Sequence, residues 1–359
     1  MSSQASSAGQ GEREVRRKIV QTGHVDAMIA IRSNFFYTRT VPCELWFFDR
    51  GKPAERLDKV LMLDARGICR KVTRVVYDFS PEQLSNLAAI VWLYRGETTR
   101  FTGLVGSYLA RSLTDARDSV EVVAAYRDAL AGLREKMMPF LDAQAGVEAM
   151  QASRLELAEA EATLSRETGG LAQAIRAVER AWPELPSDNA AQHRAAADLT
   201  VVVEASRALI RGIEHATKLS QRLVEQCERE FDARKAGAWE NVAISRLRKG
   251  LTEQSEAAVG QLRQIGYFHR QVAWLQERFP EAVLRDVDGL AKVVTLTEIE
   301  AQDWSLTPGR YVGVAAVEEE EGFDFEQALR DIHAELAGLN EEGIDLAETI
   351  QANFQELTL

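Results

Sequence analysis

An aromatic cluster, Phe35-Phe36-Tyr37, is the first feature of this 359-residue sequence that could do chemistry. It lies within residues 26–50, between two apolar runs that alternate in the manner of β-strands. No phosphate- or cofactor-binding loop precedes it, and the later GLVG sequence at 103–106 precedes a helix without following a strand. We therefore interpret the segment as half of an active site.

Histidine and cysteine give no second candidate. The five histidines are scattered, with no partner at metal-ligand spacing, and nothing local supports Ser/His/Asp or Cys/His catalysis. The three cysteines belong to no CxxC or His/Cys cluster, so we expect small apolar side chains rather than disulfides. The sequence predicts no metal site.

The formal net charge of -12 conceals an uneven distribution. Residues 1–101 carry 16 Lys/Arg against 11 Asp/Glu, whereas residues 102–359 carry 27 against 44. Phosphate contacts are therefore expected in the first hundred residues, although each cation alone could equally be a solvated surface charge. The DNA-backbone candidates are Arg13, Arg16, Arg17, Lys18, Arg32 and Arg39, followed by Arg66, Arg70, Lys71 and Arg74.

The first hundred residues predict a small α/β unit. Residues 2–11 read as a loop and residues 12–21 as a helix. Residues 25–31 and 41–48 predict an antiparallel pair of strands, and residues 59–64 a third strand buried on both faces. Ser80 followed by Pro81 is typical of a helix start, with an apolar helical face behind it.

Residues 113–279 are dominated by Ala, Leu, Glu, Arg and Gln, which predicts long helices. Apolar and small residues alternate at spacings of three and four from Leu199 to Cys227, and again from Ile265 to Phe279, as in heptad seams. Breaks are expected at Pro139, at Gly169-Gly170 and at residues 182–188. We therefore expect three or more helices folded back on one another.

The composition and pattern of the sequence change in the last 80 residues. Residues 292–296 form a short β-like run, residues 297–303 predict a capped helical turn, and residues 306–313 predict a turn containing Pro and Gly. After four glutamates, residues 323–357 predict a final amphipathic helix. No apolar run reaches the roughly 20 residues needed to cross a bilayer, and no signal peptide is present, so we expect a cytoplasmic protein.

Four sequence stretches, in this order, resemble one family. They are NFFYTRTVPCELWFFDRGK from residue 34, VLMLDARGI from residue 60, LSNLAAIVWLYRGE from residue 84 and SLTPGRYVGVAAVEEEE from residue 305. Together they look like the C-terminal part of the modification (M) subunit of type I restriction-modification systems, an adenine-N6 DNA methyltransferase family. The resemblance covers residues 1–100 and 285–359.

The resemblance implies which parts of the site are present. The family uses a glycine-rich loop for S-adenosylmethionine, an Asn-Pro-Pro-aromatic loop for the exocyclic amine, and a late aromatic motif for the flipped base. This sequence contains neither of the first two. The late motif implies a target-base pocket of Asn34, Phe36, Tyr37 and Thr38, with no complete catalytic set and no cofactor-binding residues; the alternative is that the aromatic residues are core and hairpin packing.

We therefore expect a mostly α fold with a small α/β part. The α/β part is a partial Rossmann-like methyltransferase sheet in residues 1–101, residues 102–284 are a long antiparallel coiled-coil insertion, and residues 285–359 are a C-terminal turn and helix for subunit docking. The sheet is expected to have three strands with an exposed edge that invites association.

The expected function is that of a partial modification subunit, inactive alone. It would act in adenine-N6 methylation and host DNA protection with a separate N-terminal methyltransferase half that binds S-adenosylmethionine, with the specificity and restriction subunits, and with DNA. The alternative is a non-catalytic helical scaffold or protein-interaction module derived from the family. The DNA sequence recognised is not predictable from this chain.

Overall fold

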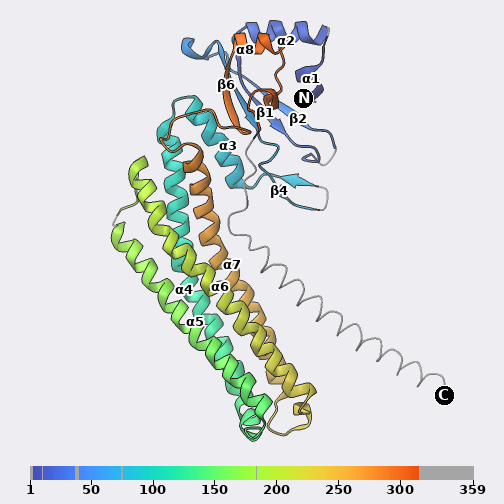
Figure 1. Cartoon of the computed structure of the whole chain (residues 1–359), viewed down its shortest axis with the longest axis vertical. Coiled ribbons are helices and arrows are strands. Elements are labelled where there is room, and N and C mark those ends of the chain that lie inside the picture. The colour runs from blue at the N-terminus through green and yellow to red at the C-terminus, as the bar shows by residue number, and fades with distance from the viewer. Residues whose placement is uncertain (1–2, 10, 37–39, 74–75, 183, 315–359) are drawn as a thin grey trace, which may run out of the picture. The chain divides into compact units, whose positions relative to one another are not determined.

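In the computed structural model, the described residues are 3–9, 11–36, 40–73, 76–182 and 184–314. The chain divides into two compact units, Met1–Val312 and Gly313–Leu359. The predicted helix at residues 323–357 lies outside the described residues. All of the architecture below belongs to the first unit (Figure 1).

A four-stranded mixed sheet forms the α/β part. Its strand order is β2 (Cys43–Phe48), β1 (Val25–Ile31), β3 (Lys59–Asp64) and β6 (Ala291–Thr295). β1 pairs antiparallel with β2 and parallel with β3, while β6 pairs antiparallel with β3. The three early strands and the later β-like run confirm the sequence predictions. The expectation of a three-stranded sheet is wrong, because β6 joins β3 and covers that edge.

The alternation of side chains along the strands gives the sheet two buried faces. Met28 of β1 and Met62 of β3 face one apolar cluster, which includes Val20 of α2 (Gly11–Gln21) and Ile299 of α8 (Leu296–Ala301). Leu61 and the other strand residues whose side chains point to the opposite face pack into the larger core, which is shared with the helices that follow. Both faces of the sheet are therefore covered.

Two short helices depart from the predicted pattern. Ser3–Ser7 forms helix α1 where the sequence predicts a loop, and Trp46 Nε1 donates to Ser6 Oγ at 3.1 Å. The Ser/Ala composition of this segment allows either a helix or a loop, so its packing on β2 selects the helix. Helix α8 is capped by Thr295, two residues before the predicted start, through a reciprocal capping box with Glu298.

Helix α3 (Pro81–Tyr94) connects the sheet to the helical part. Ser80 caps it as predicted, in a capping box with Gln83. The Ser80 hydroxyl also lies 3.1 Å from Tyr267 Oη on a later helix. Asn86 Nδ2 donates to Gln271 Oε1 at 2.9 Å, and Tyr108 Oη donates to Asn86 Oδ1 at 3.1 Å. These bonds fix α3 on the helices below it.

Four long helices form a bundle: α4 (Thr98–Ala143), α5 (Glu148–Ala181), α6 (Asn189–Arg229) and α7 (Asn241–Arg278). In Figure 1, α4 lies beside α7 and α5 beside α6, and the helices of each pair contact one another. Both predicted seams are buried, with Phe268 only partly so. None of the described helices has an apolar stretch of the length and composition that crosses a bilayer.

The helix boundaries correct three predictions. The first long helix begins at Thr98 rather than 113, and it continues past Pro139 to Ala143. Gly169-Gly170 lies inside α5, because burial of the flanking Leu164 and Leu171 outweighs the cost of about 1 kcal/mol for each helical glycine. The break at 182–188 is confirmed between α5 and α6.

Candidate nucleic-acid interface

The carboxyl ends of β1 and β3 are where a ligand site is expected in a sheet with parallel strands. Residues 32–42 leave the end of β1 there. The segment after β3 carries a small hairpin of β4 (Arg70–Lys71) and β5 (Tyr77–Asp78). The backbone N–H of Tyr77 donates to the Asn34 carbonyl at 3.1 Å, so the loop and hairpin meet.

The loop presents one aromatic ring to solvent and packs another against a neighbouring ring. Asn34 has φ of 60°, a left-handed conformation that asparagine tolerates better than most residues. The Phe35 ring then packs on Phe79, with centroids 4.6 Å apart, and on Phe36, with centroids 5.5 Å apart. Phe36 is 42 % exposed. Phe35 therefore supports the loop, whereas the face of Phe36 is open to a partner.

Arg32 brings a positive charge to the same place. Its guanidinium carbon lies 3.5 Å from the centroid of the Tyr77 ring, and Nη1 lies 3.3 Å from Cys69 Sγ. A guanidinium stacked on an aromatic face is held in place by a cation–π interaction. We call Arg32, Asn34, Phe35, Phe36, Tyr77 and Phe79 the carboxyl-edge cluster. Tyr37, Thr38 and Arg39 lie outside the described residues.

The structure places the other phosphate candidates in different parts of the α/β region. Arg13 pairs with Asp303 at 2.9 Å, Arg17 pairs with Glu14 at 2.5 Å, and Lys18 is exposed. These three lie on α2, not at the carboxyl-edge cluster. Arg70 of the later group makes two bonds to Asp78, at 2.6 and 3.0 Å, and thereby closes the hairpin.

Arg16 is the candidate that the structure contradicts. It is 2 % exposed, and its guanidinium donates to the carbonyls of Trp304 at 3.0 Å and Ala5 at 3.1 Å. Burial also lowers the pKa of Arg16 from its ordinary value. A phosphate has no access to it in this arrangement. The signal in the sequence was its spacing of four from Val20, which places both on the buried face of α2.

Glu44 is a residue of this region that the sequence analysis missed. It is 2 % exposed and lines a cavity of about 250 Å³ between the end of β1 and the start of β2, together with Arg66, Thr307 and Cys43. Burial raises the pKa of Glu44. Arg66 is held by Asp64, with Nε 2.8 Å from Oδ1. Strand alternation from Trp46 would have predicted an inward Glu44.

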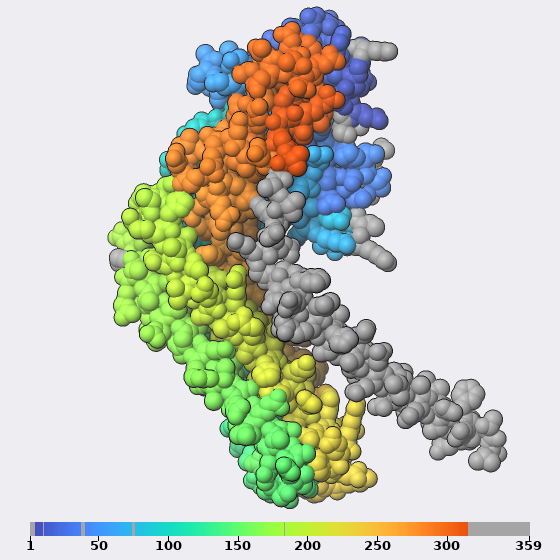
Figure 2. Space-filling view, viewed as in Figure 1, coloured from blue at the N-terminus to red at the C-terminus, as the bar shows by residue number. Residues whose placement is uncertain are grey.

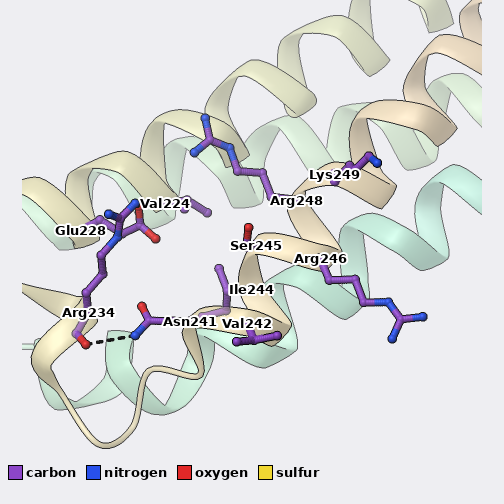
Figure 3. A pocket seen from close by; sticks show the side chains of 10 residues that line it. All are labelled: Val224, Glu228, Arg234, Asn241, Val242, Ile244, Ser245, Arg246, Arg248 and Lys249. Atoms are coloured by element: carbon purple, nitrogen blue, oxygen red, sulfur yellow. Dashed lines mark hydrogen bonds and ion pairs between the residues drawn. The ribbon is translucent and has the colours of Figure 1, made fainter.

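A larger hollow at the far end of the bundle does not form a convergent site. It has a volume of about 670 Å³ and is lined by residues of α6, α7 and the loop between them. Figure 3 shows Arg246 and Lys249 pointing away from it. Arg234 and Arg248 are paired with Glu228 and Glu225. Within the described ranges, no group of three or more His, Cys, Asp or Glu side chains could hold a metal ion.

Comparison with known proteins finds a family match in the first hundred residues. A family model described as N-6 DNA Methylase matches residues 1–105. The match contains β1, β2, β3, α3 and the carboxyl-edge cluster. It covers the first of the two segments in which the sequence resembles that family.

Two relatives are methylase subunits of type I restriction enzymes. The chain is 33 % identical over 88 residues to the methylase subunit of the type I restriction enzyme HindI of Haemophilus influenzae, covering 24 % of this chain and 18 % of that protein. It is 32 % identical over 74 residues to the methylase subunit of the type I restriction enzyme MjaIX of Methanocaldococcus jannaschii, covering 21 % of this chain and 13 % of that protein. The chain thus spans less than a fifth of either relative. Residues 1–105 are thus similar to M-subunit-like adenine-N6 DNA methyltransferases.

Proposed function

We propose that this chain is a partial modification subunit of a type I restriction-modification system, acting in the cytoplasm in adenine-N6 DNA methylation and host DNA protection. One observation carries the proposal: within the segment that matches the family, an exposed aromatic ring, Phe36, lies at the carboxyl end of the parallel strands. That is the place where a base flipped out of DNA would meet an α/β methyltransferase sheet.

The chain would supply one wall of the target-base pocket. Phe36 offers a ring face for stacking, an interaction worth about 1 to 3 kcal/mol per base. Asn34 sets the direction of the loop and carries an amide that can bond a base edge. Arg32, stacked on Tyr77, places a fixed positive charge beside the ring for a backbone phosphate. Tyr37, Thr38 and Arg39 follow in the same loop and belong to the proposed site.

The cofactor does not fit this chain's own residues. S-adenosylmethionine would need a glycine-rich turn between a strand and a helix. Here β1 continues into Arg32-Ser33-Asn34, and β3 continues into Ala65-Arg66-Gly67 and the hairpin. The 359 residues contain no Asn-Pro-Pro sequence. We therefore propose that a separate N-terminal methyltransferase half binds the cofactor and the exocyclic amine.

The proposed domains follow this division of roles. Residues 1–101 would be part of a Rossmann-like methyltransferase sheet, which the parallel pair β1 and β3 and the covered faces support. Residues 102–284 would be an antiparallel coiled-coil insertion, supported by the buried heptad seams. Residues 285–359 would dock the specificity and restriction subunits.

A non-catalytic scaffold is the second candidate. The observation that favours it is the length of the four bundle helices, 34 to 46 residues each, which make up most of the described chain. In this case the sheet would anchor the bundle, and the bundle would bind another protein.

A mixing experiment separates the two functions. An N-terminal methyltransferase fragment with both missing loops is titrated with this chain, and S-adenosylmethionine binding is followed by calorimetry. The proposed function predicts that the mixture binds cofactor more tightly than the fragment alone. The scaffold predicts identical cofactor binding with and without this chain, and that outcome would refute a shared active site.

The base pocket is tested in the same mixture. Phe36→Ala and Tyr37→Ala should lower the rate of methyl transfer to DNA and leave cofactor affinity unchanged, because stacking on the base is lost. Phe48→Ala is the matched control, since Phe48 is 55 % exposed on β2 and lies outside the cluster. If Phe36→Ala and Phe48→Ala have equal turnover, Phe36 is not part of the pocket.

A further inference from the structure

Two arginines of the bundle meet at the crossing of α6 and α7. Arg207 on α6 and Arg270 on α7 are both exposed. A Cβ placed on Gly266 would lie 3.4 Å from Arg270 Nη1 and 3.6 Å from Val203 Cγ1, so the Arg270 side chain runs back over Gly266 towards α6. Val203 is one helical turn before Arg207. The two guanidinium groups therefore share one surface.

Two other arginines of this helix pair have acidic partners. Arg263 pairs with Glu214 at 3.1 Å, and Arg248 pairs with Glu225 at 2.5 Å. Within the described part of the chain, Arg207 and Arg270 have neither a hydrogen bond nor an ion pair. Arg270 is exposed as a whole residue, but its side chain is partly desolvated where it lies over Gly266, and this desolvation together with the like charge of Arg207 lowers the pKa of Arg270. Two adjacent cations without a counter-charge are stabilised by an anion that binds both.

The pair is connected to the carboxyl-edge cluster through Tyr267. Tyr267 Oη donates to Glu82 Oε2 at 2.7 Å and lies within electrostatic range of both Arg70 and Arg270. Arg70 in turn bonds Asp78, the residue after Tyr77 of the cluster. A chain of neighbouring residues thus runs from the exposed ring of Phe36 to the bundle.

We propose that Arg207 and Arg270 clamp a phosphate of the DNA backbone and extend the DNA-binding surface from the carboxyl-edge cluster onto the bundle. The inference rests on the proposed function, because it takes DNA as the ligand of the cluster. Guanidinium forks match phosphate oxygens in geometry, and the connection through Tyr267 to the aromatic carboxyl-edge cluster favours nucleic acid over an acidic protein surface. The bundle would then hold DNA as well as connect subunits.

The test measures binding of a fluorescently labelled DNA duplex to the full chain over a series of salt concentrations. For Arg207→Ala/Arg270→Ala we expect weaker binding and a plot of log affinity against log salt that is about 2 less steep, one for each lost phosphate contact. Arg117→Ala/Arg263→Ala is the control. It removes the same charge from two exposed arginines that are already ion-paired, and it should leave the slope unchanged.

Four outcomes would overturn the clamp. If the salt dependence of DNA binding is unchanged in the double variant while Phe36→Ala binds DNA more weakly, the clamp is refuted and the proposed function is retained. If the control variant lowers the salt dependence as much as the double variant does, the effect comes from net charge and not from a phosphate contact. Polyglutamate at equal charge is tested as a competitor of DNA. If it displaces DNA from the wild-type chain and does not bind the double variant, the arginine pair binds an acidic protein. Absence of DNA binding by the wild-type chain refutes the clamp together with DNA contact by the cluster.

Discussion

The α/β part and the bundle bury different kinds of side chain. In the sheet region Arg16, Asp26, Glu44, Lys52 and Asp64 are all less than a tenth exposed, and each has charged or backbone partners. Among the described bundle residues, the buried polar groups are Ser, Thr and Gln, with Asp115 as the charged exception. The sheet region is thus assembled through charge and hydrogen bonding, whereas the bundle is assembled through apolar seams.

This difference reflects how far apart the contacting segments are in sequence. Arg16 bonds Trp304, 288 residues later, and β6 pairs with β3 after the whole bundle has intervened. In the bundle, α5 packs on α6 after a short loop, whereas α4 packs on α7 across the intervening α5–α6 hairpin. Directional bonds specify which distant segments of the sheet region belong together, while apolar seams hold the bundle helices on one another.

Loss of the Asp26 carboxylate should have the largest effect. Asp26 is 1 % exposed in its side chain and lies 2.7 Å from Arg95 and 3.4 Å from Arg56. Asp26→Ala should lower the free energy of unfolding by about 3 to 5 kcal/mol, because the cations lose their buried partner. Asp303→Ala, which breaks the exposed pair with Arg13, should cost less than about 1 kcal/mol in the same urea titration. Equal costs would remove the contrast between buried and exposed charge.

A cavity in the bundle should come second. Leu209 is fully buried in the α6 seam, and Leu209→Ala should cost about 3 kcal/mol of stability through lost apolar burial and an unfilled space. Val201→Ala on the same helix is the comparison, because Val201 is 59 % exposed and its truncation should change stability by no more than about 0.5 kcal/mol. Chemical denaturation followed by circular dichroism measures both. A small effect at Leu209 would mean that the seam does not hold the bundle.

The junction between the two regions gives a smaller effect. Ser80→Ala removes the cap of α3 and the contact with Tyr267, and should cost about 1 kcal/mol. Ser85→Ala in the same helix should be near neutral, since the Ser85 hydroxyl bonds the Pro81 carbonyl of its own helix. Thermal unfolding of both variants decides whether the cap contributes. Equal melting temperatures would contradict it.

Two glutamates of the α/β part should give opposite dependences on pH. Burial raises the pKa of Glu44, so its favourable contribution is present below its ordinary pKa of 4.5 and is lost as pH rises through the folded value. The pKa of Glu298 is lowered because its carboxylate accepts from Thr295 N–H, so its contribution is present above 4.5 and lost as pH falls. Stability curves of Glu44→Gln and Glu298→Gln should differ from wild type in opposite directions. Differences of the same sign would contradict the assignment.

Much of the architecture is predictable from local patterns. Alternation in residues 25–31 and 41–48 identifies the antiparallel pair, and the spacing from Leu199 to Cys227 identifies the buried seam of α6. The pairing of β6 with β3 is not predictable in this way, because the sequence of a strand does not identify a pairing partner more than 200 residues away. Gly169-Gly170 shows the same limit, since tertiary packing overrides local propensity.

The target-base pocket stays a prediction, but the structure shows where some of its residues lie. The Asn34 to Phe36 loop and Arg32 are placed at the carboxyl end of β1, and Phe35 packs inward. Tyr77 and Phe79, which complete the cluster, were missed because they follow a hairpin of two-residue strands without a strong pattern. Arg16 was misassigned because charge alone does not distinguish a phosphate contact from a buried guanidinium that bonds carbonyl oxygens.

Methyl transfer to DNA tests the central claim most directly. An N-terminal methyltransferase fragment with the glycine-rich and Asn-Pro-Pro-aromatic loops is mixed with the wild-type chain, with Phe36→Ala or with Phe48→Ala, and radioactive methyl incorporation into adenine is counted. Transfer that requires this chain, falls with Phe36→Ala and persists with Phe48→Ala is the predicted result. Transfer at the same rate without this chain, or with Phe36→Ala, would contradict the claim that the carboxyl-edge cluster holds the target base.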